Sequence, residues 1–216
     1  MNRLLSVACL LIIFFIAGCA SPSGPRISRE QEEMASEFLA AGDTYYKGHK
    51  YNKAVDAYKR AIEIMPSYAY AHYNLAVAYE GMKMQDEAIA SYNQAIRLKP
   101  DDPLFHYNLA MIYVRSGKYQ EAVQAFNGAV KIDPSHASAL YGIGWSYAEM
   151  GKYQEAMDYY RKAITADPYQ AGSHYALGKV YLIMGDKKAA MKEYELLISL
   201  DHIRADELLN EINNRK

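Results

Sequence analysis

Four prolines at a constant spacing constrain the fold of this chain more strongly than any other feature of its sequence. Pro66, Pro100, Pro134 and Pro168 follow one another at intervals of 34 residues. Proline ends a helix because it lacks a backbone N–H and because its ring collides with the preceding turn. A fixed period of this length indicates stacked copies of one small helical unit, so we expect a repeat array.

Three further positions of the same period carry small side chains. Each proline is placed at position 32 of a repeat. Position 8 of the five successive repeats then holds Gly42, Ala76, Ala110, Gly144 and Gly178, and position 20 holds Ala54, Ala88, Ala122, Ala156 and Ala190. Position 27 holds Ala61, Ala95, Ala129, Ala163 and Leu197. Small residues let paired helices approach closely, whereas larger ones would force them apart. Only Leu197 departs from the pattern. The pattern resembles that of the tetratricopeptide repeat, a helix–turn–helix unit.

This resemblance implies an all-α fold, namely a right-handed α-solenoid. Five repeats are expected within residues 30–202, at 35–68, 69–102, 103–136, 137–170 and 171–202. Ser28 and Gln31 form a capping-box pair, so the first helix is expected to begin beside Ser28. Glycine favours the turn between the two helices of a repeat, and position 15 holds Gly117, Gly151 and Gly185.

A capping helix is expected at residues 203–216, after the last repeat. Its inward face is predicted to hold Ile203, Leu208, Leu209 and Ile212, and its other face is polar. A terminal helix of a repeat array needs such a polar outer face for solubility.

The N-terminal residues resemble a bacterial lipoprotein signal. Arg3 precedes the uncharged run Leu4–Ile16, which at 13 residues is shorter than the roughly 20 that span a bilayer. The run ends in Ile16-Ala17-Gly18-Cys19, which resembles the lipobox, where cleavage precedes the cysteine and its thiol carries a diacylglycerol. The resemblance implies lipidation of Cys19. An ordinary cleaved signal peptide and an uncleaved anchor are the alternatives.

This interpretation divides the N-terminal region into a signal peptide at residues 1–18 and a lipid-anchored linker at residues 19–29. Ala20 follows the lipid site, and by resemblance a residue other than aspartate there favours the outer membrane. We therefore expect a protein of the bacterial cell envelope, anchored by lipid and facing the periplasm.

Charge and motifs argue against nucleic-acid binding and against catalysis. The chain has 24 basic and 25 acidic side chains, so no strong field attracts nucleic acid. No HExxH, GxSxG, P-loop or CxxC motif occurs, so no cofactor and no small-molecule substrate are expected.

Position 4 of three repeats holds His72, His106 and His174. Stacked helices lie roughly 8–10 Å apart, too far for shared metal coordination at about 2 Å, so we interpret these histidines as packing residues.

The resemblance also implies a concave groove lined by the first helix of each repeat. The side chains predicted to face it, from positions 2, 5, 6 and 9, are Tyr70, Tyr73, Asn74, Tyr107, Asn108, Met111, Tyr141, Trp145, Tyr175 and Lys179. Tyrosine, tryptophan and methionine are enriched at the centres of protein interfaces. A second interpretation stays open, because tyrosine at position 5 and asparagine at position 6 are common in the family and can reflect repeat folding. Tyr70, Met111 and Trp145 are less expected on that ground and carry more functional weight.

These patterns predict a non-catalytic protein–protein interaction scaffold that recruits a protein or peptide segment of an envelope complex. The chain resembles the small lipoproteins of type IV pilus secretin assembly and those that tether peptidoglycan hydrolases and synthases. Two alternatives stay open. One is the regulatory subunit of an envelope enzyme acting on glycan, and the other is a chaperone adaptor with an uncleaved N-terminal anchor.

Overall fold

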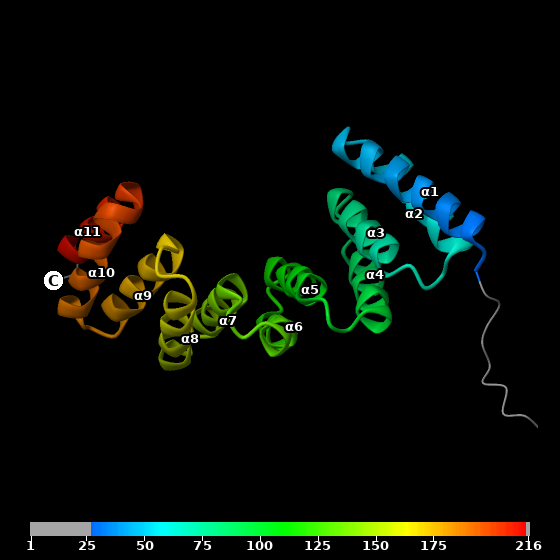
Figure 1. Cartoon of the computed structure of the whole chain (residues 1–216). Coiled ribbons are helices and arrows are strands. Elements are labelled where there is room, and N and C mark those ends of the chain that lie inside the picture. The colour runs from blue at the N-terminus through cyan, green and yellow to red at the C-terminus, as the bar shows by residue number, and fades with distance from the viewer. Residues whose placement is uncertain (1–26, 215–216) are drawn as a thin grey trace, which may run out of the picture.

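The computed structural model describes residues 27–214, in which all regular structure is helical (Figure 1). The helices are α1 (Arg29–Lys47), α2 (Tyr51–Ile64), α3 (Ala69–Gly81), α4 (Gln85–Leu98), α5 (Pro103–Arg115), α6 (Tyr119–Ile132), α7 (Ala137–Glu149), α8 (Tyr153–Ala166), α9 (Ala171–Ile183), α10 (Lys187–Leu200) and α11 (His202–Asn214). The predicted signal peptide, the lipobox with Cys19 and most of the predicted linker lie outside the described residues.

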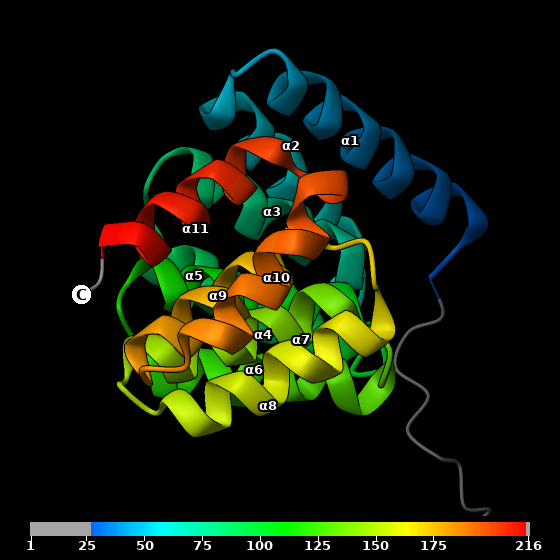
Figure 2. The same ribbon diagram turned by 90° about the vertical axis from the view of Figure 1, so that its left-hand side faces the viewer.

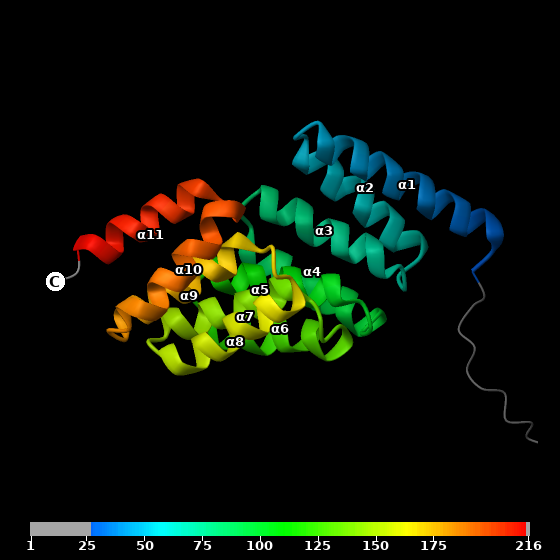
Figure 3. The same ribbon diagram turned by 60° about the vertical axis from the view of Figure 1, so that its left-hand side comes forward.

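The helices form five successive pairs, from α1–α2 to α9–α10, and the single helix α11 follows. Each helix packs mainly against its neighbours in sequence, which is the contact pattern of a solenoid. The array curves, so that α1 and α11 at its two ends lie on the same side of the central helices α6 and α8 (Figures 1, 2 and 3). The predicted all-α solenoid with a terminal capping helix is confirmed.

Helices α3, α5, α7 and α9 begin at the residues where the 34-residue period starts a repeat. Helix α1 begins earlier, at Arg29, behind the predicted capping box. The Ser28 hydroxyl accepts from the Gln31 amide at 3.2 Å, and the Gln31 side chain accepts from the Ser28 amide at 2.9 Å. This reciprocal pair satisfies two backbone donors at the helix end, so the longer α1 has a defined start.

The small residues at positions 8, 20 and 27 lie where the helices of a pair cross. All five alanines at position 20 are fully buried. A Cβ atom added to Gly42 would come within 2.4 Å of the Tyr58 ring, and one added to Gly144 within 2.8 Å of the Tyr160 ring. The aromatic side chain at position 24 therefore lies directly on the backbone of the first helix, as the close-approach argument predicted.

Position 15 has a left-handed backbone conformation in every repeat, including the two without glycine there. The φ angles are +69°, +73° and +82° at Gly117, Gly151 and Gly185, and +56° and +61° at His49 and Lys83. The turn between the two helices imposes this conformation whatever residue occupies the position. In the first two repeats a side chain bears the steric cost that glycine avoids.

The capping helix is oriented differently from the prediction. Ala205, Leu208 and Ile212 are buried in one cluster with Leu197, whereas Ile203 is 62% exposed. The prediction that Ile203 faces inward is wrong. Ile203 precedes Ala205 by two residues, about 200° around a helix, so it lies on the face opposite the buried stripe.

Candidate functional site

All ten predicted binding residues lie on the first helices of consecutive repeats. Helix α3 carries Tyr70, Tyr73 and Asn74, α5 carries Tyr107, Asn108 and Met111, α7 carries Tyr141 and Trp145, and α9 carries Tyr175 and Lys179. Every one of these side chains is at least partly exposed. We call this row of ten residues the first-helix surface.

Tyr73, Tyr107 and Tyr141 at position 5 rest against the aromatic residue at position 24 of the same repeat. Ring centroids are 5.6 Å apart for Tyr73 and Tyr92, and 5.7 Å apart for Tyr141 and Tyr160. Tyr107 contacts Phe126 in the same way, at 5.6 Å. Burial raises the pKa of Tyr73, Tyr107 and Tyr141, so these hydroxyls stay protonated and neutral. These tyrosines support the core of their repeats and remain partly exposed on the first-helix surface.

The N-terminal half of the surface is polar and internally bonded. The Asn74 amide donates to the Asp43 carboxylate at 2.9 Å, which links α1 to α3. The Asn108 amide donates to the Leu104 carbonyl at 2.9 Å and to the Tyr73 hydroxyl at 3.3 Å. Because these amides already have partners within the chain, this half has an ordered arrangement of polar groups.

The side chain of Tyr70 extends from α3 to the turn between α4 and α5. Its hydroxyl donates to the Asp102 carboxylate at 2.8 Å and accepts from the Lys99 ammonium at 2.7 Å. Its ring packs edge-on against Phe105, with centroids 5.4 Å apart. The hydrogen bonds to Tyr70 and Asp102 raise the pKa of Lys99. These contacts give Tyr70 a structural role at the junction of two repeats.

The C-terminal half of the surface contains a cleft of about 300 Å³ between α7 and α9, which we call the α7–α9 cleft. Four of the predicted residues meet there: Tyr141, Trp145, Tyr175 and Lys179. The sequence interpretation did not identify its other lining residues, which are Ala148, Glu149, Tyr160, Ala176, Val180 and Ile183. The walls are therefore mainly aromatic and aliphatic, with one cation and one carboxylate.

The aromatic walls of the α7–α9 cleft are held by neighbouring helices. Trp145 packs edge-on against Tyr119, with ring centroids 5.9 Å apart and planes at 87°. The Lys179 ammonium lies 3.3 Å from the Glu211 carboxylate of α11 and 5.4 Å from the Tyr175 ring centroid. Burial and the Glu211 and Glu207 carboxylates raise the pKa of Tyr175 to about 12. A preformed, mostly apolar cleft with few polar groups suits an apolar side chain of a partner segment.

Met111 lies between the two halves, packed against the main hydrophobic core. The nearby Tyr107 stacks on His136, with centroids 5.3 Å apart. The structure thus brings four of the ten predicted residues into one cleft and distributes the other six along the preceding repeats. The contribution of Glu211 was not predictable from the repeat pattern, because α11 does not follow the 34-residue period.

The three histidines at position 4 share one contact. The Nε2 atoms of His72, His106 and His174 lie 3.0, 3.0 and 3.1 Å from the carbonyl oxygens of Pro66, Pro100 and Pro168. Each histidine thus joins the start of a first helix to the proline of the preceding turn.

In residues 27–214 no group of three or more His, Cys, Asp or Glu side chains is placed to hold a metal. Over the same range no helix is both long and apolar enough to span a bilayer.

Family comparisons agree with the 34-residue period. Models described as tetratricopeptide repeat or TPR repeat match residues 42–83, 85–137, 107–171 and 147–210. The chain therefore belongs to the tetratricopeptide repeat family, whose members are generally non-catalytic scaffolds for protein–protein interaction. No curated protein sequence matches it significantly.

Several solved structures share this fold. A crystal structure of MamA has a TM-score of 0.72 at 22% identity, over 81% of this chain and 95% of that one. YrrB, described as a TPR protein with an unusual peptide-binding site, has a TM-score of 0.69 at 22% identity, over 84% and 94%. PilF of Pseudomonas aeruginosa has a TM-score of 0.70 at 19% identity, over 86% and 88%. At these identities the similarity establishes the fold alone.

Proposed function

We propose that this protein is a lipid-anchored adaptor of the bacterial envelope that binds a segment of a partner protein on its first-helix surface. The lipid on Cys19 fixes its location at the outer membrane, and the repeats recruit the partner. The partner belongs to an envelope assembly, of which pilus-secretin assembly and peptidoglycan synthesis or hydrolysis are the two candidates. The protein itself performs no chemistry.

The α7–α9 cleft is the observation that carries this proposal. It joins Trp145, the only tryptophan in the chain, to Tyr141 and Tyr175 in one partly exposed aromatic cavity. Large rigid aromatic side chains contribute much of the energy at protein interfaces, because they bury a large area with few rotamers to restrict. The peptide-binding site described for YrrB, which has the same fold, supports a peptide segment as the occupant.

Substitutions in the α7–α9 cleft test the binding site. We expect Trp145→Ala to weaken partner capture from detergent-solubilised envelopes at least tenfold. Ala176→Arg fills the cleft without removing a core side chain, so it should have the same effect with an unchanged melting temperature. Tyr169→Ala is the control, because Tyr169 is 80% exposed in the turn between α8 and α9 and lies outside the cleft. Normal capture by the Ala176→Arg variant would contradict the assignment.

Substitution of Cys19 tests the anchor independently of the cleft. Cys19→Ala should abolish metabolic labelling with a palmitate analogue and should release the protein from the membrane fraction. Cys19→Ser leaves a hydroxyl in place of the thiol and should give the same result. Membrane association that persists in both variants would indicate an uncleaved anchor and would contradict the lipidation proposal, while leaving the binding site unaffected.

A further inference from the structure

The fourth repeat lacks a side chain with which three other repeats contact the turn that precedes their first helix. Position 4 holds a histidine in the second, third and fifth repeats, and each histidine contacts the carbonyl oxygen of the proline six residues earlier. The fourth repeat has Leu140 at this position, six residues after Pro134. Leucine has no ring nitrogen and is shorter than histidine, so this contact is not made.

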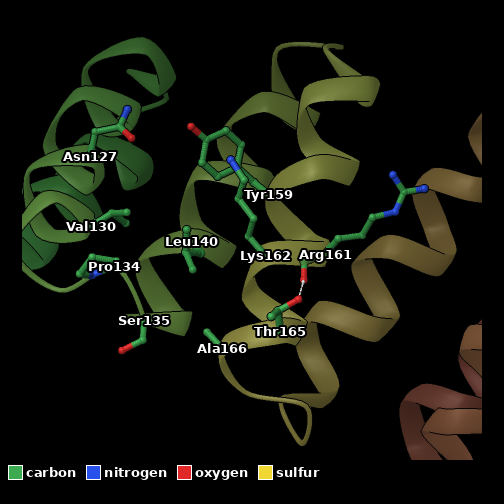
Figure 4. A pocket seen from close by; sticks show the side chains of 10 residues that line it. All are labelled: Asn127, Val130, Pro134, Ser135, Leu140, Tyr159, Arg161, Lys162, Thr165 and Ala166. Carbon is green, nitrogen blue, oxygen red and sulfur yellow. Dashed lines mark hydrogen bonds between the residues drawn. The ribbon is translucent and has the colours of Figure 1, made fainter.

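A cleft of about 550 Å³ opens at this point between the second helices α6 and α8, and we call it the α6–α8 cleft (Figure 4). Leu140 lies between its two walls. Val130 and Pro134 line the α6 side, and Tyr159 and Ala166 line the α8 side. The interior is therefore largely apolar. None of its lining residues belongs to the first-helix surface or to the α7–α9 cleft.

The fourth repeat departs from the others at a second position of the same cleft. Position 23 is Ala57, Ser91 and Ala125 in the first three repeats. In the fifth repeat it is Glu193, which lies 2.7 Å from the buried His174. In the fourth repeat it is Tyr159, whose ring forms a wall of the cleft. Leu140 and Tyr159 both line this one cavity, and no other repeat has leucine at position 4 or tyrosine at position 23.

The charge of this cleft is one-sided. Arg161 and Lys162 line it, and no acidic residue does. Arg161 points away from the cavity (Figure 4). Its guanidinium donates to the Tyr181 hydroxyl at 3.0 Å and lies 3.5 Å from the Asp158 carboxylate. The Lys162 ammonium lies 4.5 Å from the centroid of the Tyr159 ring and forms no ion pair with a carboxylate of the described residues. The cleft therefore presents a cation beside an apolar cavity.

We propose that the α6–α8 cleft is a second binding site, which takes an acidic segment of a partner protein. An apolar side chain of that segment enters the cavity above Leu140, and a neighbouring carboxylate pairs with the Lys162 ammonium. The cleft itself has no acidic residue, so the carboxylate that complements Lys162 comes from the partner. This charge complementarity favours acidic segments over other partners. Since this site lies on the second helices, the solenoid can hold one partner there and another on its first-helix surface. The proposal does not depend on the identity of either partner.

Binding of short peptides to the purified full-length protein tests this site. The probes are N-acetylated, C-amidated pentapeptides Asp-Glu-X-Glu-Asp, with Leu, Phe or Ala as X. Binding is measured at low salt from changes in the amide chemical shifts of the protein. We expect the Leu or Phe peptide to shift the amides of Leu140, Lys162 and Thr165, and the Ala peptide to bind at least fivefold more weakly. Replacing the acidic residues of the peptide by Asn and Gln should also weaken binding.

Two substitutions distinguish this site from others. Leu140→His supplies the side chain that the second, third and fifth repeats have at this position, so it should close the cleft and weaken binding at least tenfold. Lys162→Glu should also weaken binding at least tenfold, because it replaces the cation by a carboxylate. Lys162 is exposed, so this variant keeps the test valid even if Leu140→His fails to fold. Lys192→Glu, an exposed site on α10, is the control and should bind normally. Shifts confined to the first-helix surface, or unchanged binding by Lys162→Glu, would overturn the proposal. Dimerisation that Leu140→His abolishes in the absence of peptide would also overturn it, since a second copy would then be the occupant.

Discussion

The left-handed residue between the two helices of each repeat shows how the architecture acts on single side chains. Gly117, Gly151 and Gly185 adopt this conformation without steric cost, whereas His49 and Lys83 adopt it with a Cβ atom. The same turn thus differs in strain from repeat to repeat. The difference can be measured because a Cβ atom added to Gly117 would meet no heavy atom within 4 Å, so that only the backbone conformation changes.

We predict opposite effects of substitution at this position in two repeats. Lys83→Gly should stabilise the protein by about 0.5 kcal/mol, the relief of left-handed strain less the entropy that glycine adds to the unfolded chain. Gly117→Ala should destabilise it by about 1 kcal/mol. Urea unfolding followed by circular dichroism measures both, with Gly48→Ala as the control because Gly48 has a φ angle of −84°. A loss of stability in Lys83→Gly would contradict the explanation.

Asp102 combines several stabilising contacts at the start of α5. Its carboxylate accepts from the Leu104 amide at 3.2 Å and pairs with the Lys99 ammonium at 2.9 Å. Burial opposes ionisation, but the hydrogen bonds from Lys99, Tyr70 and the Leu104 amide outweigh it and lower the pKa of Asp102 below 3.8. The folded state therefore binds a proton here less readily than the unfolded chain does.

The lowered pKa of Asp102 gives its contribution a defined pH dependence. The stabilisation is complete above the unfolded pKa and is lost as the pH falls through the folded pKa. Asp102→Asn should therefore lower stability by less than about 1 kcal/mol at pH 7, because Lys99 is partly exposed, and the difference from wild type should shrink below pH 4. Thermal unfolding at pH 7, 5, 4 and 3 measures this. A difference that grows as the pH falls would contradict the sign.

At the scale of the helix, α11 shows where the repeat period stops being informative. The pairs up to α9–α10 were predictable because small residues mark positions 8 and 20 in all five copies, and prolines mark position 32 in the first four. His202 stands where a fifth proline would be expected, and α11 begins at His202 itself and buries Ala205 instead of Ile203. Hydrophobicity alone favours Ile203, the more apolar of the two residues. The buried residue, Ala205, is identified by its spacing from Leu208 and Ile212, because the three residues lie along one stripe of the helix.

Substitutions on the two faces of α11 should have very different effects. Leu208 is fully buried, and Leu208→Ala should destabilise the C-terminal repeat by about 2–4 kcal/mol through lost burial and a cavity. Ile203→Ala on the exposed face should change stability by less than about 0.5 kcal/mol. Hydrogen exchange of α9 and α10 amides reports the local effect, because contacts in a repeat array reach only neighbouring units. Similar protection losses in both variants would contradict the observed orientation.

The candidate site was only partly predictable, for a physical reason. Repeat positions indicate which face of a first helix a residue occupies, and this placed Tyr141, Trp145 and Tyr175 correctly on first helices. They do not indicate which side chains meet across two helices. The cavity between α7 and α9 depends on small residues such as Ala148 and Ala176, and the ion pair of Lys179 depends on the rotation of α11. The α6–α8 cleft likewise depends on the joint effect of Leu140 and Tyr159.

For the whole molecule, the structure describes a curved array with different chemistry along its length and on its two sides. The first-helix surface changes from hydrogen-bonded asparagines near α3 to an aromatic cleft at α7 and α9. The second helices carry a separate apolar cleft beside Lys162 of α8, which forms no ion pair with a carboxylate of residues 27–214. Such a molecule is suited to holding protein segments in a fixed arrangement, and the proposed lipid would place that arrangement at the membrane.

Photo-crosslinking in living cells tests the central claim, that a partner segment occupies the α7–α9 cleft. A benzophenone amino acid is placed at residue 176 inside this cleft and, in a separate strain, at residue 169 in the exposed turn outside it. We predict that one envelope protein crosslinks from residue 176 and not from residue 169, and that Trp145→Ala abolishes the product. No product from residue 176, or equal products from both positions, would contradict the account.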